Sequence, residues 1–423
     1  MQVEKCQKTK NGVSIYSYKN PALNGFYISL FVKAGSMYES EELSGITHFL
    51  EHVAVRNINA RRGGALYPTL DKHGLEFNAS TYSEMVQFYI SGASASFSVG
   101  AGIITELLSP LALSRDDVDT ERQRIRAEIR ESDERTSLVS FSGKRVFAGT
   151  PLSRSIVGTG KSIGKITRAR LEEYRKSQFT SENIFFYVTG RFDEKNIDEL
   201  AKLVEVYEIS HGRANENIAQ KPAAFGKREN EVYIKNSDFT MARFTFDIDM
   251  TKVGMCHSDL IYDILLSGYS SDFFMELSEK RGLCYDLTGN VERYKNIGTL
   301  SFSYEVKGDK LYDAVGRTVD CLRQLKEKIL PEEKCMKAGY VSNAYMLYDD
   351  IRELNFTFSY DNHIMGLGYS SIEDRIEAYK KVTPEELRES AREIFKRENL
   401  TLCIKANRKK VDTERLKAII SEL

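Results

Sequence analysis

The sequence predicts an α+β protein made of two similar domains. Its 423 residues exceed the length of one ordinary domain, and 41% of them are hydrophobic, which suffices for two cores. Residues 165–190 and 381–406 resemble each other at a constant offset of 216. Each segment has the pattern of a threonine-capped helix followed by a loop and a buried strand. This repeat predicts that the second domain duplicates the plan of the first.

The two segments keep their register without a gap. The matched pairs are Lys165 and Lys381, Thr167 and Thr383, Leu171 and Leu387, Phe179 and Phe395, Glu182 and Glu398, and Asn183 and Asn399. Hydrophobic runs elsewhere predict further strands in each half, with a helix between them. The polar stretch 211–230 has no clear period. It predicts a linker between a first domain at 1–210 and a second at 231–423.

Composition argues against several classes of protein. The chain has 60 basic and 61 acidic side chains, so net charge favours neither nucleic acid nor a membrane surface as a partner. No stretch approaches 18 apolar residues, and the first twelve residues lack the apolar part of a signal peptide. Six scattered cysteines without a CxxC pair predict reduced thiols. We therefore expect a cytoplasmic protein.

The stretch ITHFLEHVAV, residues 46–55, places His48, Glu51 and His52 in an apolar run. On a helix the two histidines lie one turn apart on the same face, so both can reach one cation. Two imidazoles suit zinc, and Glu51 could act as general base on a water that the zinc activates. The alternative is a set of polar groups that satisfy one another at a helix surface. A buried imidazole pair without a metal would be costly in such apolar surroundings.

A third zinc ligand has to come from elsewhere in the chain. Residues 117–136 predict a helix with many acidic side chains. Glu121 and Glu128 are seven residues apart and share a face, with Ile125 between them as an apolar anchor. The residues by themselves do not choose between the two glutamates.

His48, Glu51 and His52, followed by Glu128, resemble the insulinase-type (M16) metallopeptidases, which include pitrilysin and the mitochondrial processing peptidases. Four other segments are similar to motifs of that family. They are GLEFNAST (74–81), ERQRIRAEI (121–129), IVGTGKSI (156–163) and EKRGLCYDL (279–287). The similarity runs nearly end to end and suits the short subfamily whose members act as dimers. It implies two homologous α/β sandwich domains that face each other.

The resemblance also implies roles for residues of the first domain. His48, His52 and Glu128 would bind zinc, and Glu51 would be the general base. Glu121 would hydrogen-bond a ligand histidine and fix its tautomer. The second half offers Ile264, Ser267 and Gly268 at the repeat positions of His48, Glu51 and His52. One zinc per chain follows if the register holds.

Substrate-binding residues are implied as well. Asn78 and Ala79 would lie on an edge strand to which an extended peptide adds as a further strand. Tyr285 of the second domain would reach the oxyanion of the tetrahedral intermediate. The arginine that active members carry seven residues before this tyrosine is replaced by Ser278. Arg281 could substitute in a loop, but at the end of a helix it would point elsewhere, and we expect the second case.

The chain departs from the family once more after the zinc motif. Residues 53–64 do not follow the usual Phe-Lys-Gly-Thr continuation, so the shape of this segment is not carried over. Arg56, Arg61 and Arg62 form a small basic patch there, which we expect in a solvated loop.

These observations predict a zinc endopeptidase that cleaves extended peptides, or leader segments of small precursor peptides, in a chamber between two domains. The partner would be a second copy of the chain or a second M16-like chain that supplies the missing arginine. A non-catalytic M16-like subunit, kept for assembly or for peptide binding, is the alternative.

Overall fold

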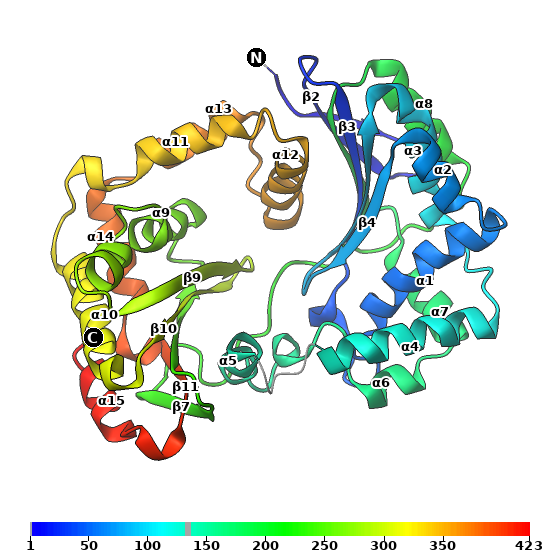
Figure 1. The fold of residues 1–423 in the computed structure, drawn as a ribbon. Coiled ribbons are helices and arrows are strands. Elements are labelled where there is room, and N and C mark those ends of the chain that lie inside the picture. The colour runs from blue at the N-terminus through cyan, green and yellow to red at the C-terminus, as the bar shows by residue number, and fades with distance from the viewer. Residues whose placement is uncertain (1, 132–136) are drawn as a thin grey trace. The chain divides into compact units, whose positions relative to one another are not determined.

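The computed structural model describes residues 2–131 and 137–423, which form two compact units (Figure 1). Each unit has its own hydrophobic core and is a domain in the physical sense. The described residues of the first unit are 2–131, 154–217 and 345–374, and those of the second are 137–153, 218–344 and 375–423.

The first unit contains a six-stranded mixed sheet in the order β1-β2-β6-β3-β5-β4, with β4 at an edge. Helices α1, α3, α7 and α8 lie over one face of the sheet, where the buried side chains of β3, β5 and β6 form the core (Figure 1). The strands are β1 (Lys5–Lys8), β2 (Ser14–Lys19), β3 (Gly25–Val32), β4 (Glu76–Thr81), β5 (Val86–Ala93) and β6 (Ile184–Gly190). The helices are α1 (Ile46–Arg61), α2 (Leu66–His73), α3 (Phe97–Thr105), α4 (Arg115–Glu131), α6 (Gly160–Lys165), α7 (Arg168–Gln178) and α8 (Glu194–Glu205).

The second unit repeats this plan with five strands in the order β7-β11-β8-β10-β9. Its strands are β7 (Glu231–Asn236), β8 (Met241–Asp249), β9 (Cys284–Arg293), β10 (Ile297–Val306) and β11 (Leu400–Ala406). Its core lies between the sheet and a layer of helices. The helices of this half are α9 (Met255–Leu266), α10 (Leu311–Glu327), α11 (Lys337–Met346), α13 (Ile372–Lys380), α14 (Pro384–Ile394) and α15 (Thr413–Ile420).

The duplication expected from the sequence is present in the fold. Helices α7 and α14 and strands β6 and β11 begin and end 216 residues apart. The repeated asparagine has the same task in both halves: the Asn183 side chain donates to the carbonyl oxygen of Gln178, and that of Asn399 donates to Ile394. Each asparagine thus satisfies a free carbonyl at the end of the preceding helix. The predicted fold class is confirmed.

The units differ from the predicted division in two exchanged helices. Helix α12 (Ile351–Phe358) comes from the second half of the chain but packs on β3 and β6 of the first unit. Helix α5 (Leu138–Val146) comes from the first half and packs on β8 and β11 of the second unit. Both sheets therefore have their second face covered by a helix from the other half. In the first unit α12 lies on the face opposite α1 (Figure 1).

Polar side chains fasten α12 to the sheet of the first unit. Asn355 is fully buried, and its amide donates to the carbonyl oxygen of Tyr187 at 2.9 Å. Its amide oxygen accepts from the Ser29 hydroxyl at 2.7 Å. Such long-range pairs leave no periodic signal in the sequence, which is why the predicted boundaries at 210 and 231 missed the exchange.

Within the described residues, no helix is both long and apolar enough to cross a membrane.

We expect Asn355→Ala to lower the melting temperature of the first unit by several degrees. The substitution leaves a buried hydroxyl and a buried carbonyl without their partner, which costs about 1–3 kcal/mol. Differential scanning calorimetry measures the change. Glu353→Gln, at an exposed position of the same helix, is the control and should melt like the wild type. Equal melting of both variants would show that α12 contributes little to the unit.

Candidate metal centre

A carboxylate from outside helix α1 stabilises the N-terminus of this helix. Gly45, the N-cap, has a φ of +89° and offers no capping side chain. Buried Glu39 replaces it by accepting the N–H groups of Gly45 and Thr47 at 2.7 and 2.9 Å. A carboxylate at this end also complements the helix dipole. Burial raises the pKa of Glu39, although these hydrogen bonds oppose the rise.

The glycine loop at 156–163 closes against the same helix end. A Cβ atom on Gly158, whose φ is +74°, would lie 2.4 Å from the carbonyl oxygen of Ser44. A Cβ atom on Gly45 would lie 2.8 Å from the Cα atom of Gly158. Two glycines are therefore needed where the two backbones touch. The contact fixes where the zinc-motif helix starts.

Helix α1 buries Phe49, Leu50 and Val53 in the core and keeps His48, Glu51 and His52 half-buried. It continues to Arg61, so the solvated loop expected for Arg56, Arg61 and Arg62 is wrong for the first two. The helix persists because Asn57 and Ile58 are buried in its last turns, and the glycines that end it come only at 63 and 64.

The structure brings His48, His52 and Glu128 together. The Glu128 Oε2 atom lies 3.5 Å from His48 Nε2 and 3.6 Å from His52 Nε2. One donor atom of each residue lies within 4.8 Å of the other two, and no second group of this kind occurs among the described residues. Two imidazoles and a carboxylate are the ligand set of catalytic zinc. The side chains therefore fit a zinc ion.

The protonation of His48 suits a metal ligand. Burial, with a smaller contribution from the neighbouring His52, lowers the pKa of His48 to about 4. The ring is therefore neutral near pH 7, and a neutral imidazole is the form that binds zinc.

Glu121 fixes the second histidine from behind. Its Oε2 atom lies 3.3 Å from Nδ1 of His52, which leaves Nε2 of that ring directed at Glu128. Burial lowers the pKa of His52, but the hydrogen bond to Glu121 and the charges of three nearby glutamates outweigh it, and the pKa is raised. Glu121 therefore hydrogen-bonds a ligand histidine, and Glu128 lies at the position of the third ligand. The sequence by itself had left this choice open.

Arg56 holds Glu121 in place and was not predicted to belong to the site. It donates to Glu121 Oε1 at 2.9 Å and to Asp117 Oδ1 at 3.0 Å. Arg124 donates to Glu121 as well, at 3.1 Å. Arg56 follows His52 by four residues on the same helix, and this spacing could have identified it.

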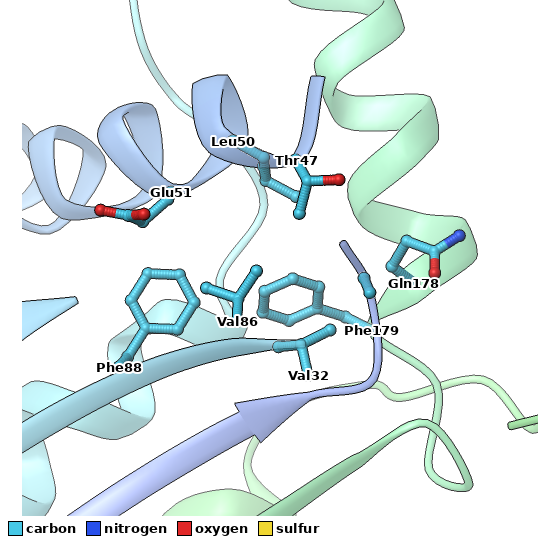
Figure 2. A pocket seen from close by; sticks show the side chains of 9 residues that line it. Val32, Thr47, Leu50, Glu51, Val86, Phe88, Gln178 and Phe179 are labelled. Atoms are coloured by element: carbon cyan, nitrogen blue, oxygen red, sulfur yellow. The ribbon is translucent and has the colours of Figure 1, made fainter. Parts of the chain in front are cut away.

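Glu51 sits between the histidines and the edge strand. It accepts a hydrogen bond from the Thr81 hydroxyl, at the end of β4. Burial raises the pKa of Glu51, the Thr81 bond opposes this, and the charge of Glu128 adds to it. A small apolar cavity lies between α1 and the strands below it, and Glu51 is one of its lining residues, with its carboxylate directed away from the other side chains (Figure 2). It is lined by Leu50, Val32, Val86, Phe88 and Phe179, among others.

Asn78 and Ala79 lie on β4, the edge strand of the first sheet. The Asn78 side chain accepts the N–H of Ala79 at 2.8 Å. The Asn78 side chain thus occupies this N–H, and a strand added at this edge would have to take the place of that side chain to bind it.

The candidate residues of the second half lie in the second unit. Tyr285 is 98% exposed near the start of β9, an edge strand. Ser278 lies in a π-helical turn, Phe274–Glu279. Arg281 follows this turn, and its Nε atom is 3.8 Å from Glu276. The segment is thus the end of a helix, as expected.

Two family models match the chain. Residues 15–160 match the insulinase model of peptidase family M16, and residues 165–338 match the model of the M16 inactive domain. An uncharacterized zinc protease of Rickettsia bellii is 24% identical over 395 residues, or 92% of this chain and 94% of that protein. A probable mitochondrial-processing peptidase subunit beta of Arabidopsis thaliana is 25% identical over 55% of this chain and 44% of its own length.

A solved protease from Helicobacter pylori has a similar fold, with a TM-score of 0.81 and 18% identity over 95% of this chain and 99% of the other. The chain belongs to the M16 family of zinc peptidases. The resemblance drawn from its motifs is confirmed.

We expect Arg56→Ala to weaken zinc binding by about tenfold to a hundredfold, because Glu121 loses the cation that holds it against His52. Competition with a chromogenic chelator measures the affinity. Arg61→Ala removes an exposed arginine from the last turn of the same helix and should leave the affinity unchanged. Wild-type affinity in both variants would mean that Arg124 suffices to hold Glu121.

Proposed function

We propose that this protein is a zinc endopeptidase that cleaves extended peptides, including leader segments of small precursors. The observation that carries the proposal is the convergence of His48, His52 and Glu128 with Glu51 one residue before His52. Zinc held by these ligands would polarise a substrate carbonyl and acidify a water molecule. One such ion per chain is proposed, since the described residues hold one such ligand cluster.

Glu51 is proposed as the general base. Its raised pKa brings the carboxyl closer to the range in which it can take a proton from water and return it to the leaving amine. The Thr81 hydroxyl restrains the carboxylate on the side of the edge strand. Glu121 and Arg56 keep His52 oriented and do not touch the reacting atoms in this scheme.

Strand β4 is proposed to bind the substrate backbone. Its position at the sheet edge, beside Glu51, allows a peptide to add as a seventh strand with main-chain hydrogen bonds near Asn78 and Ala79. Recognition through the main chain tolerates many sequences. It also requires an extended peptide, which is the form of an unfolded leader segment.

The second unit is proposed to supply Tyr285, whose exposed hydroxyl could donate to the oxyanion of the tetrahedral intermediate. Arg281 lies at the end of a helix with its Nε atom 3.8 Å from Glu276, and a partner chain is proposed as the source of the missing arginine. This supports a dimer, and in particular the role of metal-bearing subunit beside a second M16-like chain. Full activity of the chain purified alone as a monomer would contradict this part of the proposal.

The proposed compartment is the cytoplasm. No disulfide joins the six cysteines, all of which lie in the described residues, and four of them are buried. A chain of this size with six cysteines and no disulfide suits a reducing environment.

We expect Glu51→Gln to bind zinc like the wild type and to lose peptidase activity by at least about a thousandfold, because it removes the base and neither histidine. His52→Ala should lose the metal itself. Elemental analysis of the dialysed proteins and cleavage of an unstructured peptide measure the two effects.

Glu42→Gln provides the matched control, since Glu42 is an exposed glutamate shortly before α1. Cleavage at the wild-type rate by Glu51→Gln would contradict the role of the base. Absence of zinc from the wild-type protein would instead favour the non-catalytic, peptide-binding alternative.

A further inference from the structure

The side chains of β4 alternate between two different environments. Those of Phe77 and Ala79 pack against the core under α1, and Thr81 donates to Glu51 of that helix. The even-numbered residues face the other way, toward the exchanged helix α12. Glu76 pairs with Arg352 of α12 at 2.9 Å, and the ring of Tyr82, just beyond the strand, lies 5.6 Å from that of Phe356.

Three aromatic rings continue from the catalytic end of β4 across α12. Tyr82 and Phe356 meet at a tilted angle, and Phe356 stacks on Tyr360 with ring centres 6.0 Å apart. All three side chains are half-buried. We call these three residues the aromatic row. They come from sequence positions some 270 residues apart, and the exchange of α12 brings them together.

The aromatic row lies close to the end of β4 at which cleavage would occur. Tyr82 directly follows Thr81, whose hydroxyl binds Glu51. A peptide that adds to the edge of β4 alternates its side chains as β4 does. Side chains directed to the α1 layer would approach the metal ligands, and their neighbours would point to the α12 layer.

We propose that the aromatic row is a specificity site that binds a bulky apolar or aromatic side chain of the substrate, next to the cleaved bond. This inference rests on the proposed function. Half-buried rings offer apolar surface and edge-to-face contacts to another ring. Arg352 of α12 is paired with Glu76, and its guanidinium lies over the ring of Tyr89.

Two peptides that differ only at one position, Phe against Ala, test the assignment. A digest of a peptide library by the wild-type protein first shows at which of the two positions flanking the cleaved bond the enzyme is selective. The Phe and Ala peptides differ at that position. We expect the wild type to favour the Phe peptide by about tenfold or more in kcat/KM. Phe356→Ala should reduce this preference to about twofold.

Phe356→Leu keeps most of the packing on α12 and should retain an intermediate preference. Tyr67→Ala removes a 54%-exposed aromatic side chain from α2 in the same unit and should keep the full preference. Zinc content and melting temperature of each variant confirm that the fold and the metal site persist. An unchanged preference in Phe356→Ala, or a wild-type preference for charged side chains, would overturn the assignment.

A binding measurement separates this inference from the proposed function. Fluorescence anisotropy with zinc-loaded Glu51→Gln protein compares the same two peptides without turnover. We expect Glu51→Gln to bind the Phe peptide more tightly than the Ala peptide, and the further substitution Phe356→Ala to abolish this difference. This result would support the aromatic row even if the wild type cleaved neither peptide. Equal binding of both peptides would contradict it.

Discussion

The pairing of α1 with α4 is the interaction on which the site depends. His48, His52 and Arg56 follow one another at four-residue spacing along α1 and meet Glu128, Glu121 and Asp117 of α4. Arg56 and Arg124 hold Glu121, and Glu121 in turn directs His52 at Glu128. The apolar side of each helix, represented by Phe49 and Ile125, is fully buried and keeps the two helices together. The packing of α1 on α4 therefore determines the direction in which the zinc ligands point.

The parts predictable from the sequence are those with a local period. His48 and His52 are one helical turn apart, and Glu121 and Glu128 are two turns apart, so both pairs could be placed on a face before any coordinates. The repeat at an offset of 216 was equally visible, because each copy is a continuous helix–loop–strand segment. The residues alone could not show which glutamate binds the metal and which one hydrogen-bonds a ligand histidine. Both lie on one face of the helix, and they differ only in the residues of α1 that they contact.

The parts that could not be predicted depend on contacts between distant segments. Glu39 caps α1 from outside the helix, and Asn355 fastens α12 to the sheet formed by the other half of the chain. Neither residue has a distinctive neighbourhood in the sequence. The aromatic row has the same origin, because it exists only through the exchange of α12. Through the exchange of α5 and α12, each half of the chain covers the second face of the sheet formed by the other half.

X-ray absorption at the zinc K-edge of the purified protein tests the central claim most directly. The account predicts about one zinc per chain with two imidazole nitrogens and further oxygen donors, and no zinc signal from His52→Ala after dialysis. Sulfur donors, or a protein that takes up no zinc, would contradict it.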